Sequence, residues 1–176
     1  MSCNNCMTRE EVLKFVKDKN VSFIQFWFTD VLGMLKSFAV TPTELETGMT
    51  EGMGFDGSSI EGFARIEESD MIAMPDPSTF RIIPWRPTEQ REARIICDIH
   101  RPGGGPFEGD PRYILKRVLK EAADLGFVFN TGPELEFFLF KTEDGYREKK
   151  EPHDTCGYFD YSPLDMASDI RKEATF

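Results

Sequence analysis

The sequence lacks an excess of basic residues, because its 21 lysines and arginines stand against 31 aspartates and glutamates. The formal net charge of −10 argues against nucleic acid as a partner, since phosphate binding needs a basic face. The same charge disfavours an anionic membrane surface. A substrate that carries phosphate remains compatible with it, because a bound divalent metal reverses the local sign of the charge.

Long apolar runs are also missing, and the polar start of the chain has no apolar stretch of the kind found in signal peptides. The four cysteines do not make a disulfide framework in a chain of 176 residues. Cys3 and Cys6 form a lone C-x-x-C, which we interpret as part of a reduced tail. Together these features predict a cytoplasmic protein without a membrane span.

The chain nevertheless has ample material for a core, with 40% hydrophobic residues and 16 phenylalanines. Thr8 and Glu11 form a capping box that begins a helix, and Asp110 and Pro111 form the N-cap and first turn of another, ended by Gly126. Residues 41–92 show little periodicity and read as a long functional loop. Periodicity predicts helices over 9–19 and 111–125, and strands over 21–28, 35–40, 93–100, 127–131 and 134–140.

The second half of the stretch 132–140, G-P-E-L-E-F-F-L-F, is wholly apolar, which is typical of a strand buried on both faces. Glu134 and Glu136 stand at positions i and i+2, so a strand would point both carboxylates to one face, about 6–7 Å apart at their Cα atoms. Such a pair needs a counter-charge, and carboxylate oxygens suit Mg²⁺ or Mn²⁺. A solvated strand end or pairing with arginines explains the same pattern.

At this point the motifs resemble those of a known family, the type I glutamine synthetases. The matching stretches run in the family's order and cover nearly all of residues 8–171. They are F-D-G-S-S-I-E-G-F (55–63), R-I-E-E-S-D-M (65–71), C-D-I-H-R-P-G-G-G-P-F-E-G-D-P-R (97–112), G-P-E-L-E-F-F-L-F (132–140) and G-Y-F-D (157–160).

The resemblance implies an α+β fold in which an N-terminal tail and helix (1–19) precede a β-grasp domain (20–107). Residues 108–176 would then be the first helix and strands of a catalytic domain that is truncated here. The family's remaining metal ligands, ATP-binding signature and catalytic arginines lie beyond this stretch. We therefore expect the isolated chain to be inactive.

The resemblance also implies roles for single residues. Glu134 resembles the ligand of the metal that binds the nucleotide phosphates, and Glu136 resembles a ligand of the second metal; both metals would be Mg²⁺ or Mn²⁺. Asp56 resembles the aspartate that receives and deprotonates ammonium, with Ser59 and Asp70 as further members of that site. In the family this loop serves the active site of a neighbouring subunit, which implies a ring-shaped homo-oligomer.

The implied reaction is the ligation of ammonium to glutamate, driven by ATP through γ-glutamyl phosphate. Phosphorylation is needed because a carboxylate oxygen is a poor leaving group, and an acidic pocket suits ammonium because it attracts the cation and accepts its proton. Arg65, Arg86 and Arg171 are candidates for binding a regulatory dicarboxylate, with ordinary salt bridges as the alternative. Two other functions stay open: ligation of a different amine, and a non-catalytic chain that binds or regulates a complete synthetase.

Overall fold

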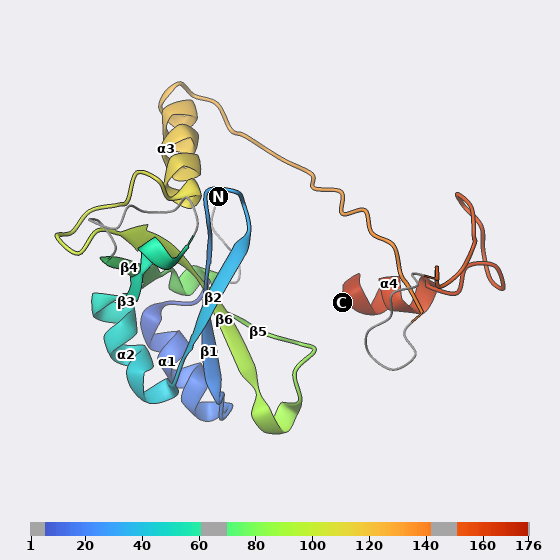
Figure 1. The fold of residues 1–176 in the computed structure, drawn as a ribbon, viewed down its shortest axis with the longest axis horizontal. Helices are drawn as coiled ribbons and strands as arrows, with labels where there is room; N and C mark the ends of the chain where they lie inside the picture. Colours follow the sequence, from blue (N-terminus) through green and yellow to red (C-terminus); the bar gives the residue numbers. More distant parts are fainter. Residues whose placement is uncertain (1–5, 61–69, 142–150, 176) are drawn as a thin grey trace. The chain divides into compact units, whose positions relative to one another are not determined.

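The structure is a computed structural model that describes residues 6–60, 70–141 and 151–175. The chain divides into two compact units, Met1–Phe129 and Asn130–Phe176. Both units are drawn in Figure 1, and each is described separately below. The combination of helices with a mixed sheet confirms the predicted α+β class.

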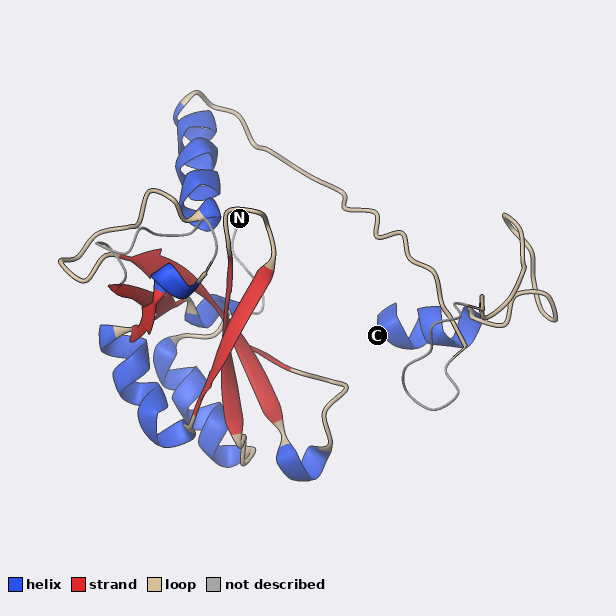
Figure 2. Ribbon diagram, in the orientation of Figure 1, coloured by secondary structure: helices blue, strands red, loops and turns tan. Residues whose placement is uncertain are grey.

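The first unit is built on a six-stranded sheet whose main path runs β2-β1-β6-β4-β3, with β5 paired to β6. β1 pairs with β6 in parallel, and the remaining pairs are antiparallel. Figures 1 and 2 show α1 and α2 lying side by side next to the sheet. The strands are β1 (Phe23–Thr29), β2 (Leu35–Val40), β3 (Met53–Asp56), β4 (Asp70–Pro75), β5 (Arg81–Ile82) and β6 (Glu92–His100), and the α-helices of this unit are α1 (Arg9–Asp18), α2 (Pro42–Glu51) and α3 (Pro111–Asp124).

Strict alternation along the central strands creates the core of this unit. On β6 the buried residues are Ala93, Ile95, Cys97 and Ile99, while the residues between them are only half-buried. β1 repeats the pattern, and its apolar face packs with buried side chains of α1 and α2. Because successive strand residues point to opposite faces, the half-buried residues of β6, among them Glu92, Arg94 and Asp98, lie on the second face of the sheet.

Several local predictions are confirmed. The capping box of α1 is present, with the backbone N–H of Thr8 bonded to the Glu11 carboxylate and the backbone N–H of Glu11 bonded to the Thr8 hydroxyl. The hairpin formed by β1 and β2 has the predicted strand positions within two residues. Gly126 follows α3 with φ +85°, a conformation that glycine adopts without steric cost.

The prediction of a long unstructured loop over residues 41–92 is wrong. The described residues of this stretch form α2, β3, β4, β5 and the 3₁₀ turns η1 (Gly57–Ser59), η3 (Pro77–Thr79) and η4 (Thr88–Gln90). The buried residues of α2 include Leu45 and Met49, one turn apart, but Gly48 and the helix threonines obscure that pattern in the sequence. β4 alternates buried and half-buried residues over only six positions, which is too short a run to be distinctive.

The strands predicted after α3 are also absent from the described residues. Residues 127–139 are extended but unpaired, and only Phe140 forms an isolated bridge, with Pro152. Leu135 and Phe138 are 81% and 83% exposed, contrary to the expected buried strand. A strand needs neighbours for its backbone N–H and C=O groups, and among the described residues such partners are found only at its end, where the Leu139 carbonyl accepts from the backbone N–H of His153 (2.8 Å) and the backbone N–H of Lys141 donates to the Glu151 carbonyl (2.9 Å).

Other differences concern α3, the tail and Cys6. The large apolar side chains of α3 and of its C-cap Leu125, spaced as a stripe that would pack against a core, are 38% to 75% exposed. The polar tail, expected to be loop-like, contains α4 (Ser168–Thr175). Cys6 is disulfide-bonded rather than reduced as expected.

A buried carboxylate, Asp110, joins α3 to the sheet. It is fully buried; its Oδ2 accepts a hydrogen bond from the backbone N–H of Ile99 (3.0 Å), and its Oδ1 accepts one from that of Arg112 (3.0 Å). The same side chain thus satisfies a sheet N–H group and an N-terminal N–H group of α3. Burial raises the pKa of Asp110, so its two hydrogen bonds offset part of a real desolvation cost.

We predict that Asp110→Ala lowers the free energy of unfolding by about 2 kcal/mol, because it removes a helix cap and leaves a buried N–H group unsatisfied. Asp124→Ala is the matched control, since Asp124 lies at the other end of α3 in an exposed ion pair with Lys120. Its loss should cost less than about 0.5 kcal/mol. Urea denaturation of both variants measures the difference, and equal costs would contradict the role of Asp110.

Candidate functional site

Two acidic residues meet where β3 ends and β4 begins. The antiparallel register of these strands pairs Asp56, the last residue of β3, directly with Asp70, the first residue of β4. Register partners in a sheet project to the same face, and both residues are exposed. Like charges placed directly opposite one another destabilise a strand pair unless a positively charged group offsets them.

The local geometry around Asp56 is set by the 3₁₀ turn η1, for which Asp56 is the N-cap. Its Oδ1 accepts hydrogen bonds from the backbone N–H of Ser58 (2.9 Å) and from the Ser58 hydroxyl (2.6 Å). These bonds orient the carboxylate at the end of the strand. Ser59 closes the same turn, but its side chain lies outside the described part of the structure.

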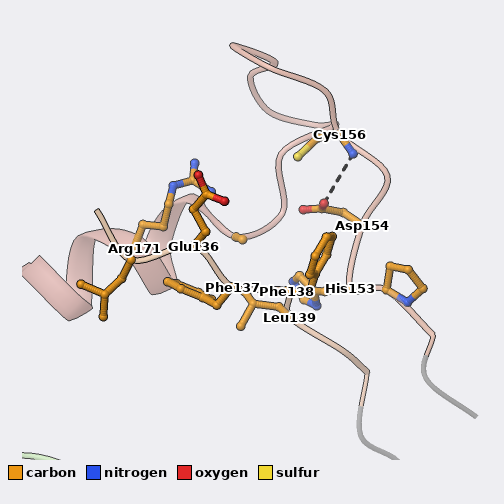
Figure 3. A pocket seen from close by; sticks show the side chains of 11 residues that line it. Glu136, Phe137, Phe138, Leu139, His153, Asp154, Cys156 and Arg171 are labelled. Atoms are coloured by element: carbon orange, nitrogen blue, oxygen red, sulfur yellow. Dashed lines mark hydrogen bonds between the residues drawn. The ribbon is translucent and has the colours of Figure 1, made fainter. Parts of the chain in front are cut away.

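The second pair of predicted acids, Glu134 and Glu136, lies in the second unit. Both side chains are exposed on an extended stretch of chain. Glu136 lines a pocket of this unit together with His153, Asp154, Cys156 and Arg171, as Figure 3 shows. Two carboxylates two residues apart on extended backbone form an oxygen donor set that fits Mg²⁺ or Mn²⁺.

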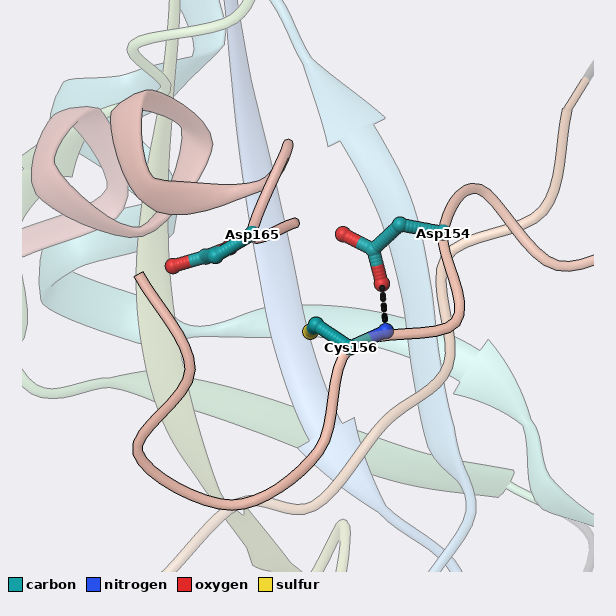
Figure 4. Close-up of side chains that lie close together, drawn as sticks. All are labelled: Asp154, Cys156 and Asp165. Carbon is teal, nitrogen blue, oxygen red and sulfur yellow. Dashed lines mark hydrogen bonds between the residues drawn. The ribbon is translucent and has the colours of Figure 1, made fainter. Parts of the chain in front are cut away.

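Asp154 and Cys156 of this pocket, with the nearby Asp165, also form a cluster that the sequence did not reveal. Potential ligand atoms of Asp154, Cys156 and Asp165 lie within 4.8 Å of one another. Figure 4 shows the Asp154 carboxylate accepting a hydrogen bond from the backbone N–H of Cys156 (3.4 Å). In the sequence, the only sign of this cluster is the spacing of Asp154 and Cys156. Its third member, Asp165, lies nine residues after Cys156 and belongs to no recognisable motif.

Hydrogen bonds within the unit account for this cluster. The second oxygen of Asp154 accepts from the backbone N–H of Met166 (3.0 Å), and the largely buried Asp165 accepts from that of Ala167 (3.0 Å). A side-chain hydrogen bond with the Asp154 carboxylate raises the pKa of the Cys156 thiol. We therefore assign the cluster a structural role.

The candidate regulatory arginines lie in separate parts of the chain. Arg86 forms an ion pair with Glu92 (3.4 Å) in the first unit. Arg171, in the second unit, is bound to Asp165, and the hydrogen bond from this guanidinium lowers the pKa of that carboxyl. Arg65 lies outside the described residues. Both described arginines thus hold a carboxylate of their own unit.

A search of the described residues finds no helix with the length and apolar character needed to span a membrane.

Comparison with protein families gives two matches in sequence order. The family model described as "Glutamine synthetase, beta-Grasp domain" matches residues 20–102. The model described as "Glutamine synthetase, catalytic domain" matches residues 108–176. The two matches adjoin at the chain segment that precedes α3.

Curated relatives agree with these matches. The chain is 53% identical over 171 residues to a glutamine synthetase of Methanosarcina mazei, a match that covers 97% of this chain and 38% of that protein. It is 47% identical over 168 residues to a glutamine synthetase of Clostridium saccharobutylicum, covering 96% of this chain and 38% of that protein. The chain therefore spans about two fifths of the length of these relatives.

Solved structures show the same fold. The cryo-EM structure of Plasmodium falciparum glutamine synthetase matches 98% of this chain and 40% of its own, with a TM-score of 0.69 at 21% identity. A structure of apo GmaS matches 65% of this chain and 26% of its own, with a TM-score of 0.59 at 29% identity.

The order of the two family matches and the identity to curated relatives lead to one conclusion: the chain belongs to the glutamine synthetase family and spans the N-terminal part of it.

Proposed function

We propose that this chain is the N-terminal part of an enzyme that ligates ammonium to glutamate, using ATP and passing through γ-glutamyl phosphate. The observation that carries the proposal is the register of Asp56 opposite Asp70. The relatives that match nearly the whole chain are named glutamine synthetases, which agrees with this reading.

In this proposal Asp56 and Asp70 attract ammonium, and Asp56 accepts its proton. Ammonium has no lone pair until it is deprotonated, so a carboxylate next to it is needed for attack on the acyl phosphate. The fixed orientation of Asp56 at the start of η1 supports this role, because its Oδ1 is already held by Ser58. Ser59, in the same turn, would complete the ammonium site.

Glu134 and Glu136 would hold Mg²⁺ or Mn²⁺, since their oxygen donors suit these cations. A divalent cation bound there offsets negative charge on the phosphoryl group transferred from ATP. The role of the two carboxylates would be to bind the cation and hold it at a defined position of the chain. Their exposure in the described structure leaves both of them accessible for such binding.

The wider proposal concerns assembly and location. Residues 20–107 would form the β-grasp domain and residues 108–176 the start of the catalytic domain. The Asp56 loop of one subunit would serve the metal site of its neighbour in a ring-shaped homo-oligomer in the cytoplasm. The isolated chain would then make no glutamine, because it holds only part of each active site.

Two other functions compete with this one. A ligase for a different amine would use the same two aspartates, since other amines are also cationic. A non-catalytic chain that binds or regulates a complete synthetase would need neither carboxylate pair. Both alternatives are separated from the main proposal by the experiments below, which measure ammonium use directly.

The test uses a hybrid enzyme in which this chain replaces the matched 171 residues of the Methanosarcina mazei relative. We predict that Asp56→Asn in the hybrid lowers glutamine formation at least about 100-fold, because it removes both a cation partner and a proton acceptor. Formation of γ-glutamyl phosphate should persist, and the free energy of unfolding should change by less than about 0.5 kcal/mol.

Mixing Asp56→Asn subunits with Glu136→Ala subunits then tests the shared active site. Each mixed ring can assemble some sites with an intact Asp56 loop and an intact metal strand, so activity above either parent is expected. Mixed rings no more active than their parents would show that the loop and the metal strand serve one subunit. Equal use of ammonium and a bulkier amine by the hybrid would favour the alternative ligase.

For the metal site we predict that Glu134→Ala in the hybrid weakens Mn²⁺ binding at least about tenfold, because one oxygen ligand is lost. Glu121→Ala is the matched control, since Glu121 is an exposed glutamate of α3 far from the pair in sequence. Isothermal titration with Mn²⁺ measures both affinities. Unchanged Mn²⁺ affinity in Glu134→Ala would remove Glu134 from the metal site.

We further propose that Arg65, Arg86 and Arg171 are each candidates for binding a regulatory dicarboxylate. Supporting this, Arg86 and Arg171 already bind carboxylates of the chain, those of Glu92 and Asp165. Arg86→Ala should then weaken inhibition or activation of the hybrid by dicarboxylates at least about threefold, with substrate affinities unchanged. A dose–response curve identical to that of the unaltered hybrid would leave Arg86 with its salt bridge alone.

A further inference from the structure

Two arginines are placed directly opposite one another on the second face of the sheet. Arg94 of β6 is the register partner of Arg81 on β5, and on its other side it is the register partner of Gln25 on β1. The three strands can be followed in Figure 1. Register partners share a face, so the two guanidinium groups extend from neighbouring positions, an arrangement that destabilises the strand pair unless an anion joins them.

The Arg94 side chain is held in a defined position. Its Nη1 donates a hydrogen bond to the backbone carbonyl of Thr79 (2.7 Å), and its guanidinium carbon lies 5.5 Å from the centroid of the Trp27 ring. The residue is half-buried. Arg81 is anchored similarly, because its Nη1 donates to the backbone carbonyl of Phe80 (2.5 Å). The remaining N–H donors of both groups are left for another acceptor.

Neither arginine has a carboxylate partner among the described residues, although the chain carries a net charge of −10. The nearest acid on this face of β6 is Glu92, two residues before Arg94. Glu92 is already engaged, by Arg86 (3.4 Å) and by the side-chain amide of Gln25 (3.1 Å). Burial and the neighbouring Arg81 charge lower the pKa of Arg94, in accord with an uncompensated positive site.

We propose that Arg81 and Arg94 form a binding site for a small oxyanion, with phosphate as its simplest representative. The guanidinium groups of these two register partners supply forked N–H donors, which match the oxygens of a phosphate or carboxylate group. The Trp27 ring beside Arg94 offers an apolar surface to any organic part of the ligand. This site uses different residues from the proposed ammonium and metal sites and does not depend on the proposed function.

The chain offers a built-in reporter for the test, because its two tryptophans are Trp27 and Trp85. In a Trp85→Phe background, fluorescence reports on Trp27 alone. Titration of the 176-residue chain with inorganic phosphate, at ionic strength held constant with sodium chloride, should give a saturable change. The dissociation constant should rise at least about tenfold in Arg94→Gln and in Arg81→Gln, because each loses a charge-assisted donor.

Arg91→Gln is the matched control. The Arg91 guanidinium donates a hydrogen bond to the backbone carbonyl of Lys19, and Arg91 is not part of the proposed site formed by Arg81 and Arg94. It should leave phosphate affinity unchanged. Arg81→Gln keeps the test valid if Arg94→Gln fails to fold, since Arg81 is exposed on a two-residue strand. The proposal is overturned if phosphate gives no saturable change, or if Arg91→Gln weakens binding equally. It is also overturned if the Trp27 signal follows chain concentration instead of phosphate, which would mean that carboxylates of a second copy occupy the arginines.

Discussion

The alternation of side chains along β6 is the constraint on which the rest of the first unit depends. One face of this strand supplies Ala93, Ile95, Cys97 and Ile99 to the core, so β1, β4 and β5 must pair with it in registers that extend the same apolar surface. A slip of one residue would bury the charged face. The backbone N–H of Ile99 also binds Asp110, so the same strand determines where α3 begins.

Fixed registers also bring like charges together at two places. Asp56 lies opposite Asp70 where β3 and β4 meet, and Arg81 lies opposite Arg94 where β5 and β6 meet. Like charges at opposed strand positions repel one another, and groups of opposite charge offset that repulsion. The first suits a small cation and the second a small anion, so one sheet would present sites of opposite charge. In each case a backbone register, rather than a flexible surface, sets the separation of the charges.

The sequence predicted those features that local chemistry decides. The capping box of Thr8 and Glu11, the cap at Asp110 and the strand centred on Ile96 depend on a few neighbouring residues, and all three are present. The pairing of Asp56 with Asp70 could not be derived in the same way. It depends on two short strands within a stretch that shows little periodicity, and strand pairing is a long-range property.

The second unit was predicted less well, for a physical reason. The apolar stretch around Phe138 can form a buried strand only against other strands, and no described segment pairs with it beyond the bridge at Phe140. The chain covers only 38% of the Methanosarcina mazei relative. The resemblance thus located Glu134 and Glu136 in the sequence, and within this unit both side chains are exposed.

We propose that this chain supplies part of a glutamine-forming active site. The most direct measurement is the transfer of ¹⁵N-ammonium into the amide of glutamine by the unaltered hybrid enzyme, in the presence of ATP and Mg²⁺. The account predicts ¹⁵N-labelled glutamine, formed with one phosphate released for each amide made. A folded, assembled hybrid that binds ATP and glutamate but produces no labelled glutamine would contradict it.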